Sequence, residues 1–122
     1  MGTKLIFSSS TELFRIPADA LVFVRADGNY STVTMADRSE FVLTLQLGQI
    51  EKLIHDSIDG TENDCFIRIG KSLIINRNFI SHINVARQKM VLSDCRSFRH
   101  EVSASKEALK ALKALIEQEE SR

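Results

Sequence analysis

Turn-forming residues recur at short intervals along the chain, and this spacing is the feature that most restricts its fold. Five turn regions are separated by short segments that are apolar or that alternate between apolar and polar residues. The turn regions are residues 27–29, 36–39, 59–64, 86–88 and 94–96. Turns spaced in this way are typical of an antiparallel β domain. The sequence therefore predicts a mainly β fold with hairpin connections.

Six of the segments between turns are predicted strands, and two longer segments are predicted helices. The predicted strands are residues 21–25, 30–35, 41–45, 80–85, 89–92 and 97–102. Leucine and isoleucine recur at helical spacing in residues 46–55 and 103–119, so each of these segments is expected to bury one apolar stripe. Ser103 or Ser105 is expected to cap the second helix, and Pro17 to begin a turn before the first predicted strand.

The predicted strand at residues 80–85 shows the clearest alternation of side-chain character. A regular strand there would place alternate residues on opposite faces. One face would hold Ile80, His82 and Asn84, and the other Ser81, Ile83 and Val85.

The length and composition are those of one ordinary globular domain covering residues 1–122. Hydrophobic residues make up 43% and charged residues 26% of the 122 positions. No segment has the length of a membrane span, and the N-terminus does not have the pattern of a signal peptide. Cys65 and Cys95 have no CxxC spacing, which predicts a reducing, cytoplasmic setting without disulfides. The three histidines lie far apart in sequence, so no metal site is expected.

The net charge is zero, but the charges are unevenly distributed along the chain. Residues 1–64 hold five basic and ten acidic residues, whereas residues 65–106 hold eight basic and two acidic residues. A basic segment beside an acidic one is compatible with a single positive face. The alternative interpretation is that these charges are spread around a solvated surface.

The segment from residue 66 to residue 80, FIRIGKSLIINRNFI, carries the most distinctive motif. It resembles the central signature of the LytTR family of bacterial DNA-binding domains. The positions in register with that signature are Phe66, Arg68, Lys71, Ser72, Ile74, Asn76 and Ile80. Residues 21–33 resemble an earlier family segment through Gly28, Asn29 and Tyr30, and Val102 with Ser103 resembles its closing segment. Together the similar segments cover about residues 12–116.

The resemblance implies an elongated antiparallel β fold with one short internal helix and a C-terminal helix. It also implies a transcription regulator that reads the major groove of double-stranded DNA through loops, alone or as a homodimer. The candidate base contacts are Asn76, Asn29 and Tyr30, and Asn76 comes first because an amide can both donate to and accept from an adenine edge. The candidate phosphate contacts are Lys71, Ser72, Arg77, Ser103, Ser105 and Lys106.

Each candidate also has a purely structural interpretation. Asn29 follows Gly28 in a turn, where asparagine is favoured for backbone reasons alone. Tyr30 is compatible with a half-buried strand position, and Asn76 with a turn residue that ends a strand. Lys71 and Arg77 are compatible with solvated surface charges. Arg68, which alternates with apolar neighbours, is expected to form an intramolecular ion pair rather than a DNA contact.

Two positions depart from the family pattern. Gly70 stands where a histidine is common, and Ala104 stands where relatives carry an arginine suited to reading guanine. Three interpretations of Ala104 are open. The protein reads a different DNA sequence, Lys106 or Arg99 replaces the missing arginine, or DNA binding is weak.

The runner-up function is a LytTR-like protein-interaction or dimerisation module that has lost DNA affinity. An enzyme is not expected, because no histidine lies at a catalytic spacing from a nucleophile. Gly70-Lys71-Ser72 is not a nucleotide-binding loop, since Cys65 replaces the upstream glycine. No cofactor, small-molecule substrate or membrane partner is implied, and no receiver domain is expected within the chain.

Overall fold

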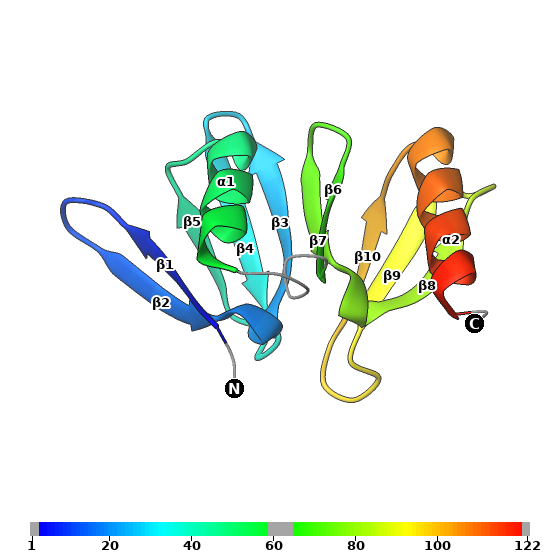
Figure 1. Ribbon diagram of the computed structural model, residues 1–122, viewed down its shortest axis with the longest axis horizontal. Coiled ribbons are helices and arrows are strands. Elements are labelled where there is room, and N and C mark those ends of the chain that lie inside the picture. The colour runs from blue at the N-terminus through cyan, green and yellow to red at the C-terminus, as the bar shows by residue number, and fades with distance from the viewer. Residues whose placement is uncertain (1–2, 59–64, 121–122) are drawn as a thin grey trace. The chain divides into compact units, whose positions relative to one another are not determined.

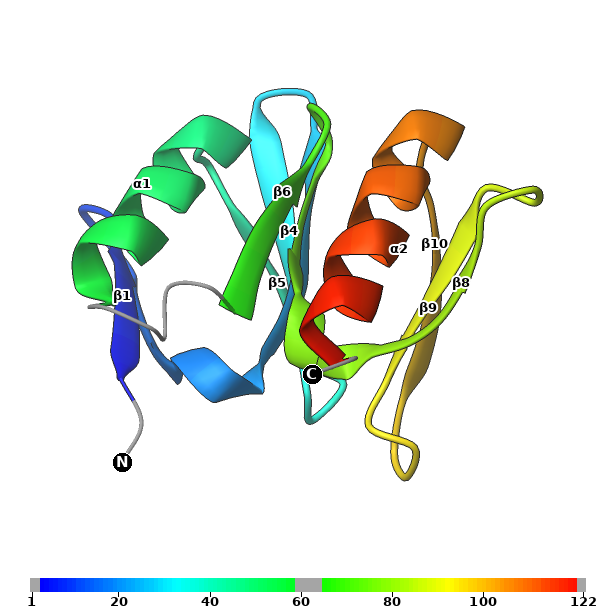
Figure 2. The ribbon, with the colours of Figure 1, turned by 45° about the vertical axis from the view of Figure 1, so that its right-hand side comes forward.

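The computed structural model describes residues 3–58 and 65–120, so the turn predicted at residues 59–64 lies outside the described residues. The chain divides into two units, Met1–Asn78 and Phe79–Arg122, which are considered in turn. The described residues form ten strands in three antiparallel sheets together with two α-helices (Figures 1 and 2). This composition confirms the predicted mainly β fold with one internal and one C-terminal helix. Within these residues, no helix has the length and apolar character needed to cross a membrane.

A five-stranded sheet with the order β5-β4-β3-β7-β6 forms the centre of the first unit. Its strands are β3 (Leu21–Asp27), β4 (Tyr30–Met35), β5 (Glu40–Leu43), β6 (Phe66–Ile69) and β7 (Leu73–Asn76). All neighbouring strands are antiparallel. The strands predicted at residues 21–25, 30–35 and 41–45 are confirmed, although β5 ends two residues earlier than expected.

Helix α1 (Leu47–Ser57) packs against this unit's core and confirms the helix predicted at residues 46–55. Leu47, Ile50 and Ile54 are buried because their spacing puts them on one face of the helix. Burial of each such side chain contributes about 1.5–3 kcal/mol relative to full exposure. At the start of the helix, the Gln49 side chain accepts a hydrogen bond of 2.8 Å from the Gln46 backbone N–H.

A hairpin at the N-terminus completes the first unit and was not predicted from the sequence. Strand β1 (Lys4–Ser8) pairs antiparallel with β2 (Leu13–Pro17). Leu5 and Phe7 are buried in the core, whereas Ile6 is half exposed. The burial of side chains thus alternates along β1, but over too few residues for the strand to be recognised from the sequence. The turn expected at Pro17 is confirmed, because a short 3₁₀ helix, η1 (Ala18–Ala20), follows that residue directly.

The second unit consists of a three-stranded sheet, with the order β10-β9-β8, and helix α2 (Lys106–Glu120). Its strands are β8 (Ile80–Asn84), β9 (Lys89–Ser93) and β10 (Arg99–Ser103), close to the three predicted segments. A 3₁₀ turn, η3 (Arg77–Phe79), precedes β8. Leu109 and Leu112 of α2 are buried, and the helix lies against β8. The apolar stripe of this helix is therefore covered in its first half, while Leu115 remains 38% exposed.

The regular alternation predicted for β8 is wrong, because the strand contains an irregularity between Ile80 and His82. Ile80 pairs with Leu92 and Ile83 pairs with Met90, so the two isoleucines share a face. His82 pairs instead with Val91, on the opposite face of β9. One extra residue in a strand shifts all later side chains to the other face, which a sequence pattern cannot reveal.

Candidate nucleic-acid interface

The turn between β3 and β4 presents the first pair of candidate contact residues. Gly28 and Asn29 form a two-residue turn, because Asp27 pairs with Tyr30 across the hairpin. Gly28 has a φ of +66°, which suits glycine at the first position of such a turn. Asn29 is exposed, and the Tyr30 side chain is 51% exposed. Both side chains are therefore open to a ligand. Tyr30 begins β4 and is about half covered, so it also fits the alternative interpretation as a half-buried strand residue.

The turn between β6 and β7 lies beside the first one. Gly70, with a φ of +59°, begins this turn, and Lys71 and Ser72 are exposed within it. The backbone N–H of Ala26 donates a hydrogen bond of 2.9 Å to the carbonyl oxygen of Ser72, which ties the turn to the end of β3. Figures 1 and 2 show the two turns at the same end of the five-stranded sheet. The structure thus brings four candidate residues together: Asn29, Tyr30, Lys71 and Ser72.

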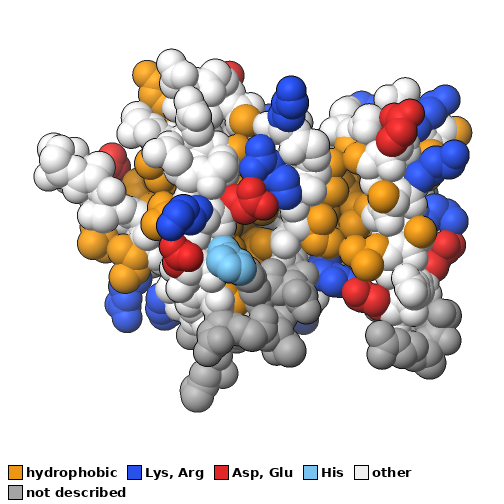
Figure 3. All heavy atoms as spheres, turned by 45° about the horizontal axis from the view of Figure 1, so that its top comes forward, with side chains coloured by type: hydrophobic (Ala, Val, Ile, Leu, Met, Phe, Trp, Pro, Cys, Tyr) orange, Lys and Arg blue, Asp and Glu red, His pale blue; other side chains and the backbone are white. Residues whose placement is uncertain are grey.

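Arg68 braces the turn between β6 and β7 from within the unit. Its guanidinium forms an ion pair of 2.7 Å with Glu51 of α1, and its Nε donates to the carbonyl oxygen of Gly70 at 3.0 Å. The prediction that Arg68 forms an intramolecular ion pair is therefore confirmed. Figure 3 shows Lys and Arg side chains over this hairpin, with an acidic side chain among them. Lys71 is the basic residue of this turn. Unlike Arg68, it forms no ion pair with an acidic side chain among the described residues.

Asn76 lies in a different environment from the other candidates. Its side chain is buried, with 1% of its surface exposed. The side-chain Nδ2 donates to the carbonyl oxygen of Leu21 at 3.0 Å, and Oδ1 accepts from the backbone N–H of Asn78 at 3.0 Å. Both ends of the amide are thus used within the first unit. This arrangement favours the alternative interpretation, in which Asn76 ends strand β7 and begins a turn.

Arg77 is also separated from the residues of the turn between β6 and β7. It follows β7, whereas Lys71 and Ser72 precede it. A strand of four residues spans roughly 13 Å. Asn76 and Arg77 are therefore placed at the opposite end of the sheet from the two exposed turns.

In the second unit, the candidate residues gather at the start of α2. Ser105 caps the helix, because its Oγ accepts a hydrogen bond of 3.1 Å from the backbone N–H of Ala108. Of the two serines expected as caps, Ser105 is thus the one used. The Ser103 hydroxyl instead accepts from Lys89 Nζ at 3.0 Å, across the β9–β10 pair. Lys106 is exposed in the first turn of the helix, where backbone N–H groups and the helix dipole favour anions.

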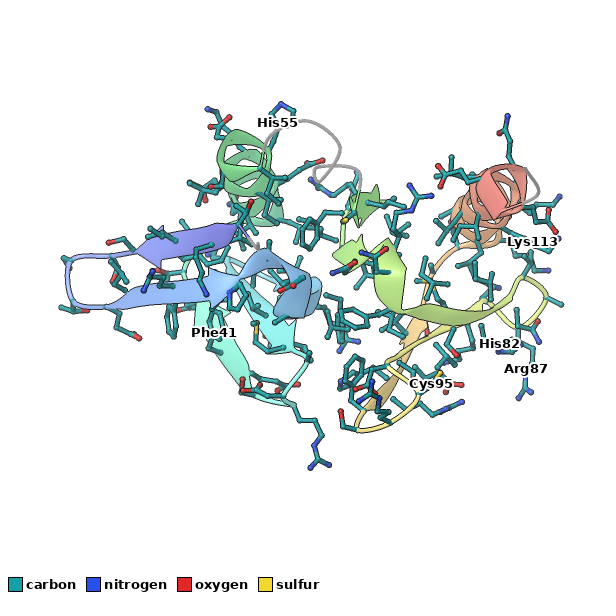
Figure 4. The ribbon with its side chains drawn as sticks, turned by 60° about the horizontal axis from the view of Figure 1, so that its bottom comes forward. Phe41, His55, His82, Arg87, Cys95 and Lys113 are labelled. Atoms are coloured by element: carbon teal, nitrogen blue, oxygen red, sulfur yellow. The ribbon has the colours of Figure 1, made fainter. Side chains whose placement is uncertain are left out.

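Two basic residues near this helix start were not singled out from the sequence. Arg87 is exposed in the turn between β8 and β9, labelled in Figure 4, and Lys89 begins β9. The carbonyl oxygen of Gln88 accepts a 3.3 Å hydrogen bond from the N–H of Ala104, which holds the turn beside the segment that precedes α2. Figure 3 shows basic side chains over this turn. Their place in the basic stretch was visible in the sequence, but their proximity to Ser103 was not.

The turn between β9 and β10 lies at the other end of the three-stranded sheet and is fixed by one carboxylate. Asp94 accepts hydrogen bonds from the Ser97 hydroxyl and from the backbone N–H groups of Arg96, Ser97 and Phe98. The Ser97 hydroxyl, followed by these backbone donors, holds the pKa of Asp94 far below its usual range. Arg99 belongs to this end, because it begins β10, whereas Ala104 follows the strand's end. Of the two proposed substitutes for the missing arginine, Lys106 is thus the one close to Ala104 in the second unit.

The family model of the LytTr DNA-binding domain matches residues 11–117. A solved structure from Bacillus cereus, described as the LytTr DNA-binding domain of a methyl-accepting/DNA response regulator, matches with a TM-score of 0.62 and 19% sequence identity. The match covers 95% of this chain and 98% of the other, and at this identity it shows a shared fold. No curated protein matches the chain. Because the family model covers most of its length, the chain belongs to the LytTR family of DNA-binding domains.

Proposed function

We propose that this protein is a transcription regulator that binds specific duplex DNA through the major groove with two groups of turn residues, one on each unit. The first group is Asn29, Tyr30, Lys71 and Ser72, and the second is Arg87, Lys89, Ser103, Ser105 and Lys106. The observation that carries the proposal is that exposed candidate side chains converge on strand-end turns in a chain whose family binds DNA. Asn76 and Arg77 are left out, because the first is buried and both lie at the other end of β7.

The side chains within the two groups suit different parts of DNA. Asn29 and Tyr30 present an amide and a phenol, which can pair with base edges. Lys71, Lys89 and Lys106 supply charge for phosphate oxygens, and serine hydroxyls can orient on the same atoms. The free backbone N–H groups at the start of α2 can also donate hydrogen bonds to a phosphate group.

Arg87 is proposed to supply the guanidinium that position 104 lacks. Its turn is joined to Ala104 by the hydrogen bond to Gln88, so an exposed arginine stands next to the altered position. A guanidinium can donate two parallel hydrogen bonds to guanine, which the compact ammonium of lysine cannot reproduce. Arg87→Lys should therefore keep general DNA affinity but lose discrimination at one base pair, by about 1–3 kcal/mol.

Fluorescence anisotropy with two labelled duplexes tests the proposal. One duplex is the DNA upstream of the protein's own gene, and the other has a random sequence. Tight binding to the first duplex that weakens with salt is expected, because phosphate contacts release condensed cations. Lys71→Ala and Lys106→Ala should each lower the slope of log Kd against log salt by about 0.9 and weaken binding roughly tenfold at 0.1 M salt.

The chain offers matched control substitutions in the same units. Lys52 and Lys113 are exposed helix lysines, each paired with a carboxylate one helical turn later. Lys52→Ala and Lys113→Ala should leave the salt slope unchanged. If the control variants and the turn variants weaken binding equally, the proposed contact groups are wrong. If neither duplex binds at low salt, the interaction-module function replaces the regulator.

A further inference from the structure

An open, largely apolar groove lies on the first unit, and none of the proposed DNA-contact residues lines it. It has a volume of about 750 Å³ and is lined by β2, η1 and the β4–β5 hairpin. The apolar lining includes Phe14, Ile16, Met35 and Phe41. The rings of Phe14 and Phe41 stack with centroids 4.1 Å apart, and Figure 4 shows Phe41 next to β2. A groove of this size and lining has the character of a binding site, since ligand pockets measure roughly 300–1,000 Å³.

The groove reaches an edge of the five-stranded sheet. Strand β5 is the last strand on its side and pairs with β4. Successive residues of a strand point to opposite faces, yet Glu40 and Phe41 both line the groove. The groove therefore reaches the edge of β5 at its first two residues. At such an edge, main-chain groups face outward and offer a template for another strand.

The charge of the groove is of one sign. Its titratable lining residues are Asp37 and Glu40, both of them carboxylates. The hydroxyl and the N–H of Ser39 hold the pKa of Asp37 below its usual value, so this carboxylate stays ionised near neutral pH. Arg38 lies between them in sequence with a φ of +75°, but it does not line the groove. The lining thus combines an apolar floor with a negative rim.

We propose that this groove binds an extended segment of a partner protein, which adds as a strand beside β5. Main-chain hydrogen bonds to the edge would supply affinity. Apolar side chains of the segment would fill the groove, and its lysine or arginine side chains would face Asp37 and Glu40. A second copy of this chain would bring the same two carboxylates to the contact, and this like-charge repulsion disfavours self-pairing.

A random eight-residue peptide library displayed on phage provides the probe. The full chain is the bait, and the Glu40→Lys variant is used for counter-selection. Enriched peptides should alternate apolar residues with lysine or arginine. A synthetic peptide of the most enriched sequence should bind the wild-type chain in anisotropy measurements and bind the Glu40→Lys variant at least about fivefold more weakly.

The controls separate this groove from the rest of the molecule. Glu40 is exposed. Glu40→Gln is a milder variant, and its peptide affinity should lie between those of the wild-type chain and the Glu40→Lys variant. Glu101→Lys makes the same charge change at an exposed position of the second unit and should leave peptide affinity unchanged. In NMR spectra, the changes in backbone amide chemical shift on peptide addition should be largest in β5. The peptide should also bind equally in the presence of DNA, which keeps this test independent of the proposed regulator function.

Three results would overturn the inference. The first is the absence of any peptide enriched on the wild-type chain over the Glu40→Lys variant. The second is enrichment of peptides that lack basic residues, or of peptides that change the amide chemical shifts of the second unit. The third is self-association of the chain without peptide that Glu40→Lys abolishes, which would assign the groove to a second copy.

Discussion

Replacement of Asn76 by alanine should destabilise the fold rather than remove a DNA contact. The Asn76 side chain is 1% exposed and donates at 3.0 Å to the Leu21 carbonyl oxygen, which lies in the core strand β3. Alanine leaves that buried oxygen without this partner, and such a loss costs about 1–3 kcal/mol. The second bond, from the N–H of Asn78, is partly exposed, so water can replace it at smaller cost. We expect the free energy of unfolding to fall by about 2 kcal/mol.

Urea denaturation followed by circular dichroism measures this effect. Small domains lose roughly 1–3 kcal/mol of stability per molar urea. The midpoint of the Asn76→Ala variant should therefore lie about 1 M below that of the wild-type chain. Asn29→Ala is the matched control, because Asn29 is an exposed turn residue. Its free energy of unfolding should stay within about 0.5 kcal/mol of the wild-type value.

DNA binding of the same two variants distinguishes the two interpretations of Asn76. At a temperature where both variants are fully folded, Asn76→Ala should bind specific DNA within about twofold of wild type, because a buried amide cannot reach a base. Asn29→Ala should lose discrimination between the two duplexes. The reasoning is refuted if Asn76→Ala has the wild-type urea midpoint and has lost specific binding. That result would make Asn76 a base contact that becomes exposed on DNA.

Three further predictions concern the scaffold. Leu112→Ala removes a buried side chain of α2 and should cost about 2–5 kcal/mol, measured by thermal denaturation, whereas Leu115→Ala at its exposed neighbour should cost under about 1 kcal/mol. Gly28→Ala should cost about 1–2 kcal/mol by urea denaturation, because φ is +66° and no atom lies within 4 Å of the added methyl group; a cost near zero would mean that the turn changes conformation. Asp94 has a lowered pKa in the folded protein, so its contribution is present above the unfolded value of 3.8 and is lost as pH falls below it. Amide exchange of Ser97 and Phe98 should accordingly stay constant between pH 5 and 7, after correction for the intrinsic rate, and Asp94→Ala should accelerate it.

Much of the fold could be predicted from local patterns. The strand at residues 30–35 has the predicted bounds, because polar and apolar residues alternate there between two clear turns. Helix α1 followed from the spacing of Leu47, Ile50 and Ile54. The N-terminal hairpin did not follow, since β1 has only Leu5 and Phe7 as inward residues. Likewise, the irregularity in β8 reverses the expected faces, because one extra residue in a strand leaves no mark in the pattern.

The candidate site was less accessible to sequence reasoning than the fold. The motif named Asn76 and Lys71 together, since they lie five positions apart in one signature. Because an extended strand separates the residues at its two ends, the structure places Lys71 before one end of β7 and Asn76 at the other end. Asn76 is also buried. Lys89 and Arg87 had no motif to mark them. Their proximity to Ser103 and Ala104 arises from antiparallel pairing and a turn hydrogen bond.

The sequence by itself indicated the fold class and most of the elements, because turn chemistry and hydrophobic spacing act over neighbouring residues and are written directly in the chain. Its motifs indicated the family. The tertiary structure decided which candidate side chains are exposed and which of them share one end of a sheet. It also decided that the edge of β5 adjoins an apolar groove with an acidic rim. These properties depend on pairing between residues far apart in sequence, and such pairing is fixed only when the strands pack together.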